Sequence, residues 1–240
     1  MHGMAPEFPG GGPVAGGTGA ADAVSDGVSD ANAGAAVAGG AGAPGAPDGL
    51  PAAKAALRRQ LVTARRGLTD AERGAAGRLL RDAVLALPEA QMAGTAAVYY
   101  SVGTEPDTRG LAYALWKRGT YVLLPLLLPD GDLDWASYEG PGSLAPGPRG
   151  LLEPAEPPRG TAAVASADLV IVPALAADRR GVRLGRGGGS YDRALARVGR
   201  PVPTVALLYD GELLDEVPAG PHDLPVRMIV QPGKGITRAS

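Results

Sequence analysis

The chain contains no cysteine and only two histidines among its 240 residues. Without cysteine it has no disulfide bonds, thiolate metal sites or cysteine nucleophiles. A histidine-based metal cluster or a Ser-His-Asp triad would have to use His222, because His2 lies in the N-terminal segment. No serine follows the Gly-x-Ser-x-Gly pattern that would provide a nucleophile for such a triad. The composition therefore gives no support for covalent catalysis by a protein side chain.

Long apolar runs are also missing. No stretch approaches the roughly 18 apolar residues of a membrane span, and no basic region precedes an apolar segment near the N-terminus. We therefore expect a cytoplasmic protein without a membrane partner.

Residues 1–50 contain five acidic residues and no lysine or arginine, and glycine and alanine dominate them. They show no apolar periodicity, so we expect a disordered tail over 1–50. Because the whole chain carries a net charge of −2, the remainder carries +3. That balance suits a small anionic ligand and is too weak for a nucleic-acid partner. Residues 51–240 are long enough for one core, and we expect one monomeric domain there.

The periodicity of the remaining chain alternates between strand and helix. Helices are expected over 52–66, 70–87 and 107–118 and from about Ser190, and strands over 95–100, 121–124, 168–172 and 204–208, with candidate strands over 133–138 and 226–230. A Pro/Gly-rich loop is expected over 140–160, and a long loop between Val172 and Gly185. This order predicts an α/β fold, a three-layer domain with a mostly parallel central sheet and its ligand at the carboxyl ends of the strands.

The most informative segment is 183–193, Arg-Leu-Gly-Arg-Gly-Gly-Gly-Ser-Tyr-Asp-Arg. Its glycines adopt positive φ readily and let backbone N–H groups approach an anion closely. Its arginines match phosphate oxygens with paired donors. A helix is expected to start directly after the glycines, where its dipole favours an anion. The segment therefore predicts a phosphate-binding loop, although a glycine-rich turn alone is more often a flexible surface loop.

Four further residues have a functional and an ordinary interpretation. Lys54 and Arg58 lie one helical turn apart, which suits an anion held between them or a solvated basic face. Glu105 follows an expected strand, where its carboxylate can accept N–H bonds from a heterocycle or close a turn. Asp223 can bind a metal ion together with Asp192. Asp192 can also stabilise the helix end, and Asp223 can form a turn.

Together these features resemble the 5-formyltetrahydrofolate cyclo-ligase family, also called methenyltetrahydrofolate synthetase. The resemblance covers nearly all of residues 51–232, and segment 183–193 is its most specific part. The other motifs are Lys54-x-x-x-Arg58, Glu105-Pro-Asp-Thr108, Gly150-Leu-Leu-Glu-Pro154, Asp168-Leu-Val-Ile-Val-Pro173 and the stretch from Pro218 to Pro225, which contains His222-Asp223.

The resemblance implies an ATP- and Mg²⁺-dependent ligase that cyclises 5-formyltetrahydrofolate to 5,10-methenyltetrahydrofolate and releases ADP and phosphate. It implies that Arg186 lies nearest the transferred phosphoryl group and is the catalytic candidate. It places Mg²⁺ on Asp192 and Asp223, and the folate against Tyr100, Glu105 and Ser190. The ATP-binding residues that it implies are Lys54, Arg58, Arg183, Leu184, Gly185, Arg186, Gly187, Gly188, Gly189, Ser190 and Tyr191.

The chain departs from the family pattern at four positions. Ser190 replaces a tyrosine that touches folate, and Ala177 replaces a loop aromatic. Arg227 stands where an acidic residue is expected, and Gln231 replaces a frequent threonine. These departures affect the expected folate contacts more than the expected ATP contacts.

Two other functions fit part of this pattern. A nicotinamide dehydrogenase would use Gly185-x-Gly187 and Asp210, but its glycines must follow a strand directly, whereas Val172 lies thirteen residues before Gly185. Ser190 also replaces the third glycine of that fingerprint. A non-catalytic nucleotide or sugar-phosphate binding module would need the arginines and glycines without two carboxylates placed for a metal. Metal-dependent turnover distinguishes that module from the ligase.

Overall fold

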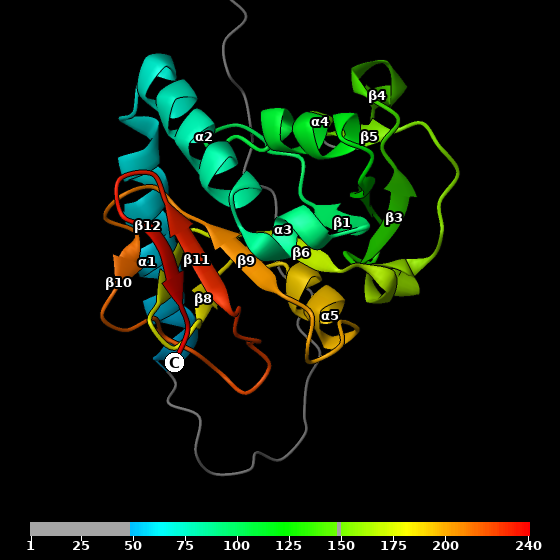
Figure 1. The fold of residues 1–240 in the computed structure, drawn as a ribbon. Helices are drawn as coiled ribbons and strands as arrows, with labels where there is room; N and C mark the ends of the chain where they lie inside the picture. The colour runs from blue at the N-terminus through cyan, green and yellow to red at the C-terminus, as the bar shows by residue number, and fades with distance from the viewer. Residues whose placement is uncertain (1–48, 148–149) are drawn as a thin grey trace, which may run out of the picture. The chain divides into compact units, whose positions relative to one another are not determined.

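The computed structural model describes residues 49–147 and 150–240 (Figure 1). The tail expected over 1–50 therefore lies almost entirely outside the described residues. Within them, no helix is both long enough and apolar enough to cross a bilayer.

A seven-stranded sheet forms the centre of the fold. Its strands are, in spatial order, β12 (Gly235–Arg238), β11 (Met228–Gln231), β9 (Thr204–Leu207), β6 (Leu169–Pro173), β1 (Thr95–Val98), β2 (Tyr121–Leu127) and β3 (Leu133–Ser137). The five inner strands are parallel to one another, and each edge strand runs antiparallel to the inner strand beside it. The prediction of an α/β fold with a mostly parallel central sheet is confirmed.

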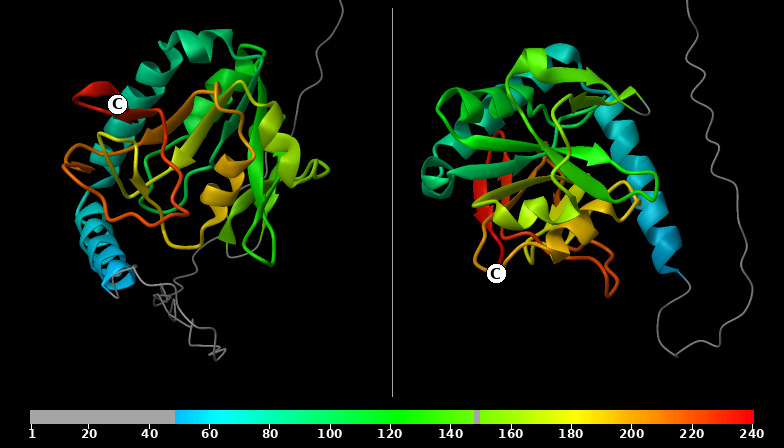
Figure 2. Two further views of the ribbon diagram at one scale, coloured as in Figure 1. Left: turned by 90° about the horizontal axis from the view of Figure 1, so that it is seen from below. Right: turned by 90° about the vertical axis from the view of Figure 1, so that its right-hand side faces the viewer.

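Helices cover both faces of this sheet (Figures 1 and 2). The helices are α1 (Leu50–Arg66), α2 (Asp70–Leu85), α3 (Pro88–Met92), α4 (Arg109–Lys117) and α5 (Ser190–Ala196). Residues of α2, α3 and α4 pack with Val98 in one core, and residues of α5 pack with Ala97 in another. Because successive strand residues point to opposite faces, the two cores lie on opposite sides of the sheet and give three layers.

Helix α1 packs elsewhere. Its Leu61 lies in a third core with Leu175, Ala176, Leu184 and Val217. This core belongs to a small sheet of β10 (Leu213–Leu214), β7 (Ala176–Asp178) and β8 (Arg183–Leu184). In both views of Figure 2, α1 lies at the periphery of the main sheet. The prediction of a long loop between Val172 and Gly185 was wrong, because β7 and β8 lie within it.

Helix ends follow the local sequence closely. Gly67 ends α1, and Thr69 forms a capping box with Glu72 at the start of α2. The prediction that α2 continues to Leu87 was wrong: it ends at Leu85, and Pro88 starts α3, where a missing N–H costs nothing. The predicted strand 95–100 ends at Val98, which leaves Tyr99 and Tyr100 in the following segment.

Further strands also lie where the sequence did not predict them. The expected loop over 140–160 contains a two-stranded hairpin of β4 (Leu144–Pro146) and β5 (Leu152–Pro154). The strand expected over 226–230 starts later, at Met228, and is not the last one. It turns back through Gly235, which has φ +68°, into the antiparallel strand β12.

Candidate active site

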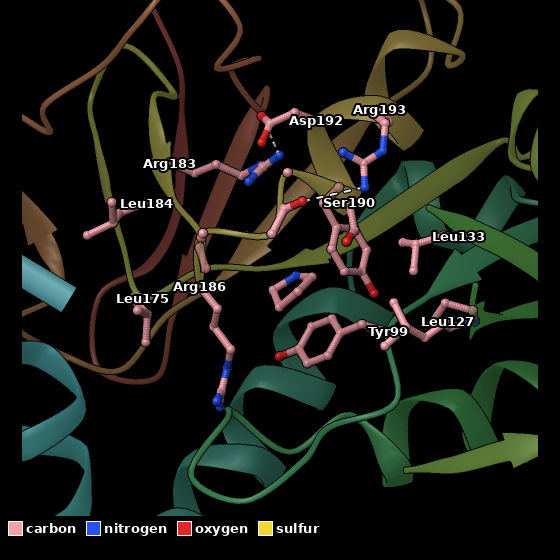
Figure 3. Close-up of a pocket in the computed structure, with 18 of the residues that line it drawn as sticks. Tyr99, Leu127, Leu133, Leu175, Arg183, Leu184, Arg186, Ser190, Asp192 and Arg193 are labelled. Carbon is pink, nitrogen blue, oxygen red and sulfur yellow. Dashed lines mark hydrogen bonds and ion pairs between the residues drawn. The ribbon is translucent and has the colours of Figure 1, made fainter. Parts of the chain in front are cut away.

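A cavity of about 1140 Å³ opens at the carboxyl ends of the central strands (Figure 3). Tyr99 and Tyr100 reach it from the segment after β1, and Ala174 reaches it from the segment after β6. Lys54 and Arg58 enter it from α1. This is the end of a parallel sheet at which ligands bind in α/β proteins, as the sequence predicted.

The glycine-rich loop forms one wall of this cavity. It starts directly after β8, and Gly187 and Gly189 have φ values of +108° and +68°. Residues with a Cβ rarely adopt such values, which explains glycine at both positions. The Arg58 Nε donates to the carbonyl oxygen of Gly185 at 2.8 Å and so fastens the loop to α1. Every residue from Arg183 to Arg193 lines the cavity.

Helix α5 begins at Ser190 as predicted. It is only seven residues long and ends at Ala196. Two short turns give a weaker dipole than a long helix, and the charge of the cavity comes mainly from its side chains.

Three ion pairs lie inside the cavity, and two of them join distant parts of the chain. The Lys54 ammonium donates to Asp223, and Arg183 Nη2 donates to Asp192 Oδ1 at 2.8 Å. Arg186 Nε donates to Glu105 Oε1 at 3.0 Å. The pairing of Lys54 does not fit a simple solvated face, because its side chain is only 15% exposed and faces the cavity. An anionic ligand would compete with these carboxylates for the same cations.

Burial and hydrogen bonding set the charges of this wall. Burial alone would raise the pKa of Asp223, but the N–H of Gly220 and the ammonium of Lys54 lower it by more, so the pKa lies below its usual value. Asp223 is therefore ionised at neutral pH. Burial lowers the pKa of the Arg183 guanidinium, which the charge of Asp192 partly offsets. Arginine titrates so high that Arg183 remains a cation.

Asp192 and Asp223 lie on the same wall. Asp192 Oδ1 accepts the N–H of Leu224, the residue directly after Asp223, at 3.1 Å. Each of the two carboxylates has one oxygen that accepts no hydrogen bond from any described residue. Residues 49–147 and 150–240 contain no group of three or more His, Asp or Glu side chains placed for a metal. Two carboxylates nevertheless suit Mg²⁺, which takes its other oxygen ligands from phosphate and water.

The opposite side of the cavity contains Tyr100 and Glu105. The Glu105 side chain is only 9% exposed, and its Oε2 accepts the N–H of Val102 at 2.9 Å. Its Oε1 faces Arg186, so the structure brings together a residue expected at the folate and one expected at ATP. Tyr100 is half-buried beside Tyr138, with ring centroids 6.5 Å apart.

An aliphatic wall, which the sequence analysis did not identify, completes the cavity. It consists of Pro125, Leu127, Leu133, Leu151 and Leu152. Glu153 fastens the β4–β5 hairpin to β2, because its Oε1 accepts the N–H of Leu127 at 3.1 Å. The motif Gly150-Leu-Leu-Glu-Pro154 was visible in the sequence and would have located part of this wall.

The departures from the family pattern differ in their placement. Ser190 lines the cavity, and its hydroxyl donates to the carbonyl oxygen of Gly131. Ala177 is buried in β7, and Gln231 Nε2 donates to the carbonyl oxygen of Tyr209 at 3.3 Å. Arg227 donates to the carbonyl oxygen of Arg200. Of these four positions, only Ser190 is among the described residues that line the cavity.

Comparisons with known proteins agree with this site. Residues 51–232 match the sequence profile of the 5-formyltetrahydrofolate cyclo-ligase family. The 5-formyltetrahydrofolate cyclo-ligase of Mycolicibacterium smegmatis is 38% identical over 192 residues, which are 78% of this chain and 97% of that protein. The enzyme of the same name from Escherichia coli is 32% identical over 173 residues, 71% of this chain and 95% of that protein.

Solved structures show the same fold. The NMR structure of Aquifex aeolicus 5,10-methenyltetrahydrofolate synthetase superimposes with a TM-score of 0.68 at 27% identity, covering 78% of this chain and 92% of that chain. The synthetase from Mycoplasma pneumoniae superimposes with a TM-score of 0.58 at 20% identity, covering 73% and 96%, and supports the fold alone. The chain therefore belongs to the 5-formyltetrahydrofolate cyclo-ligase family of ligases.

Proposed function

We propose that this protein cyclises 5-formyltetrahydrofolate to 5,10-methenyltetrahydrofolate with Mg²⁺ and ATP. The observation that carries the proposal is the composition of this cavity. Its glycine-rich loop and cations suit a triphosphate, its two neighbouring carboxylates suit Mg²⁺, and its aliphatic wall with Tyr100 suits a flat organic ring.

The triphosphate would lie along the glycine-rich loop. Gly185 to Gly189 present backbone to the cavity, and Lys54, Arg58 and Arg183 place positive charge around it. Leu184, Ser190 and Tyr191 complete this wall. The Arg186 side chain is 58% exposed. In this proposal it turns from Glu105 to the transferred phosphoryl group. We therefore assign Arg186 the catalytic role of neutralising charge on that group.

The folate would lie between the aliphatic wall and Tyr100. Glu105 is held by the N–H of Val102, so its remaining oxygen can accept N–H bonds from the amide edge of the pterin once Arg186 turns to phosphate. In this chain Ser190 offers no ring for stacking. Leu127, Leu133, Leu151 and Leu152 supply the apolar contact on that side.

Asp192 and Asp223 would hold Mg²⁺ through their oxygen atoms that accept no hydrogen bond. When bound, the ion would supply positive charge that offsets the negative charge developing during phosphoryl transfer.

The reaction needs no protein nucleophile. The formyl oxygen attacks the γ-phosphorus of ATP, and the bond to the leaving ADP breaks. N10 of the folate then attacks the activated formyl carbon and loses its proton as phosphate departs. The protein holds the two substrates in line and supplies cations where phosphoryl charge develops. This role agrees with a chain that has neither cysteine nor a Gly-x-Ser-x-Gly motif.

The purified protein is expected to release ADP from Mg-ATP only when 5-formyltetrahydrofolate is present, because the formyl oxygen is the nucleophile. A coupled ADP assay, run beside the absorbance of the methenyl product, should give about one ADP per product molecule. Equal ADP release with and without the folate would indicate a nucleotide hydrolase. Nucleotide binding without product formation would indicate a binding module.

Replacing both Lys54 and Arg58 with alanine is expected to raise the KM for ATP about tenfold or more, because each charged hydrogen bond to phosphate contributes about 1.5–3 kcal/mol. Folate affinity measured without nucleotide should change little. The matched control is Arg59→Ala with Arg66→Ala, which removes two exposed cations of α1 that do not line the cavity. If the two double variants have the same KM for ATP, the assignment of Lys54 and Arg58 to the phosphates is wrong.

A further inference from the structure

The turn between β2 and β3 lies against the glycine-rich loop and α5. Its shape is fixed by backbone hydrogen bonds, from Leu128 N–H to the Asp132 carbonyl and from Gly131 N–H to the Leu128 carbonyl, both at 2.9 Å. Gly131 has φ +81°, which favours glycine. The adjoining residues Leu127 and Leu133 are paired across the hairpin and both line the cavity.

Three side chains of the α5 region hold this turn. Ser190 Oγ and Arg193 Nη2 both donate to the carbonyl oxygen of Gly131. Arg197 donates to both oxygens of Asp132, at 3.0 and 2.5 Å. Arg193 Nε lies 3.7 Å from Asp132 Oδ1, and its Nη2 also reaches the carbonyl oxygen of Gly188 at 3.4 Å. The guanidinium of Arg193 therefore touches the turn and the glycine-rich loop at once.

Asp132 is central to this arrangement and does not line the cavity. It is 8% exposed, and its carboxylate pairs with Arg193 in α5 and with Arg197 directly after that helix. Hydrogen bonds from Arg197 hold the pKa of Asp132 below its usual value, so it is ionised at neutral pH. Arg197 is likewise absent from the cavity wall, whereas Arg193 is part of it.

We propose that Asp132 is a positioning residue for the nucleotide, and that it fixes the glycine-rich loop against the β2–β3 turn through Arg193 and Arg197. The backbone hydrogen bonds of the turn and the adjoining β2–β3 ladder do not depend on the Asp132 side chain, which also accepts the N–H of Leu133 at 2.8 Å. The loop and the seven-residue α5 depend more on side-chain contacts. Loss of the Asp132 charge should therefore displace the loop and leave the aliphatic wall in place.

This inference rests on the proposed function, because it needs a nucleotide in the loop. It also supplies a role for Ser190, where the resemblance implies a tyrosine. The serine hydroxyl donates to the carbonyl oxygen of Gly131 and so holds the glycine-rich loop against the turn.

The test compares Asp132→Ala with Glu89→Gln, which weakens the Arg238–Glu89 ion pair away from the cavity. We expect Asp132→Ala to raise the KM for ATP and the Kd for Mg-ADP about tenfold, since small displacements of binding groups have large effects. The KM for 5-formyltetrahydrofolate should stay within about twofold. Glu89→Gln should leave all three constants unchanged. Thermal unfolding of each variant separates positioning from lost stability.

Two further variants keep the test decisive. Asp132→Asn retains an acceptor for Arg197, so its Kd for Mg-ADP should lie between the values of the parent and of Asp132→Ala. It takes the place of Asp132→Ala in the test if the alanine variant does not fold. Arg197→Ala should weaken Mg-ADP binding similarly, and combining it with Asp132→Ala should add little further loss. The proposal is overturned if Mg-ADP binding is unchanged in these variants, or if both substrates weaken equally. A parent that binds Mg-ADP without forming product would contradict the proposed function alone.

Discussion

Glu212→Ala is expected to destabilise the protein by about 3–5 kcal/mol, because it leaves the buried cation of Arg65 without its counter-charge. Arg65 is 2% exposed, and its Nε and Nη2 donate to the two oxygens of Glu212 at 2.6 and 2.8 Å. Burial alone would lower the pKa of Arg65, and the hydrogen bonds and charge of Glu212 raise it above its usual value. Without Glu212, the partners that its side chain keeps among the described residues are the carbonyl oxygen of Ala174 and the ring of Tyr209.

Urea and thermal unfolding measure this effect, and the melting temperature should fall by about 10 °C or more. The control is Arg65→Met combined with Glu212→Leu, which removes both charges and is expected to recover most of the stability, since replacing a buried ion pair with apolar groups is often neutral. A loss below about 1 kcal/mol in Glu212→Ala would mean that water reaches Arg65 after the substitution. That outcome would contradict the tight burial seen here.

The same ion pair supports the cavity, so substituting it is expected to affect activity as well as stability. Arg65 Nη2 holds the carbonyl oxygen of Ala174, a cavity residue, at 2.7 Å. The Tyr209 ring lies 5.3 Å from the Arg65 guanidinium carbon, and the Tyr209 hydroxyl donates to the carbonyl oxygen of Glu105 at 3.2 Å. Variants of the pair should therefore be compared by stability before their kinetics are interpreted.

The sequence predicted the elements whose causes are local. The glycine at position 67 and the capping box of Thr69 act within a few residues, and beside them the helices expected over 52–66 and 70–87 end and begin as predicted. Strand β7 has no such cause, because Ala176–Asp178 is three residues long and rich in alanine, a poor strand former. It pairs on one side with β8, a few residues later, and on the other with β10, more than thirty residues later, and no local pattern reveals the pairing with β10. Strand β12 was predictable: the segment Pro232-Gly233-Lys234-Gly235 before an Ile-Thr-Arg run is typical of a hairpin.

Much of the site was also predictable from the chain. The glycine-rich loop follows from residue types that occur side by side, and Lys54, Arg58 and Asp223 do line the same cavity. The partners of these charges were not predictable, because Lys54 and Asp223 are 169 residues apart. The aliphatic wall was missed for a similar reason. Leu133 and Leu152 belong to different hairpins, and only the tertiary fold turns both toward one ligand.

Asp192→Asn is expected to lower turnover on the order of a hundredfold at saturating Mg-ATP, since a carboxylate that holds Mg²⁺ in phosphoryl transfer contributes several kcal/mol. The amide keeps an oxygen that can accept from Arg183 and Leu224, as Asp192 Oδ1 does, so the wall should keep its shape while the charge is lost. Production of the methenyl product, measured over a range of Mg²⁺ concentrations, gives both the turnover and the Mg²⁺ requirement. We expect the requirement to rise as the turnover falls.

Asp210→Asn is the matched control for this substitution. Asp210 is an exposed carboxylate outside the cavity wall that accepts the N–H of Gly233 at 3.1 Å, and it is the residue that a nicotinamide dehydrogenase would have used. Its substitution should leave turnover unchanged, because the proposed ligase reaction places no substrate or metal ion at that carboxylate. If Asp192→Asn instead runs within about twofold of the parent, the charge of Asp192 serves only to pair Arg183, and Asp223 and the phosphates must hold the metal without it.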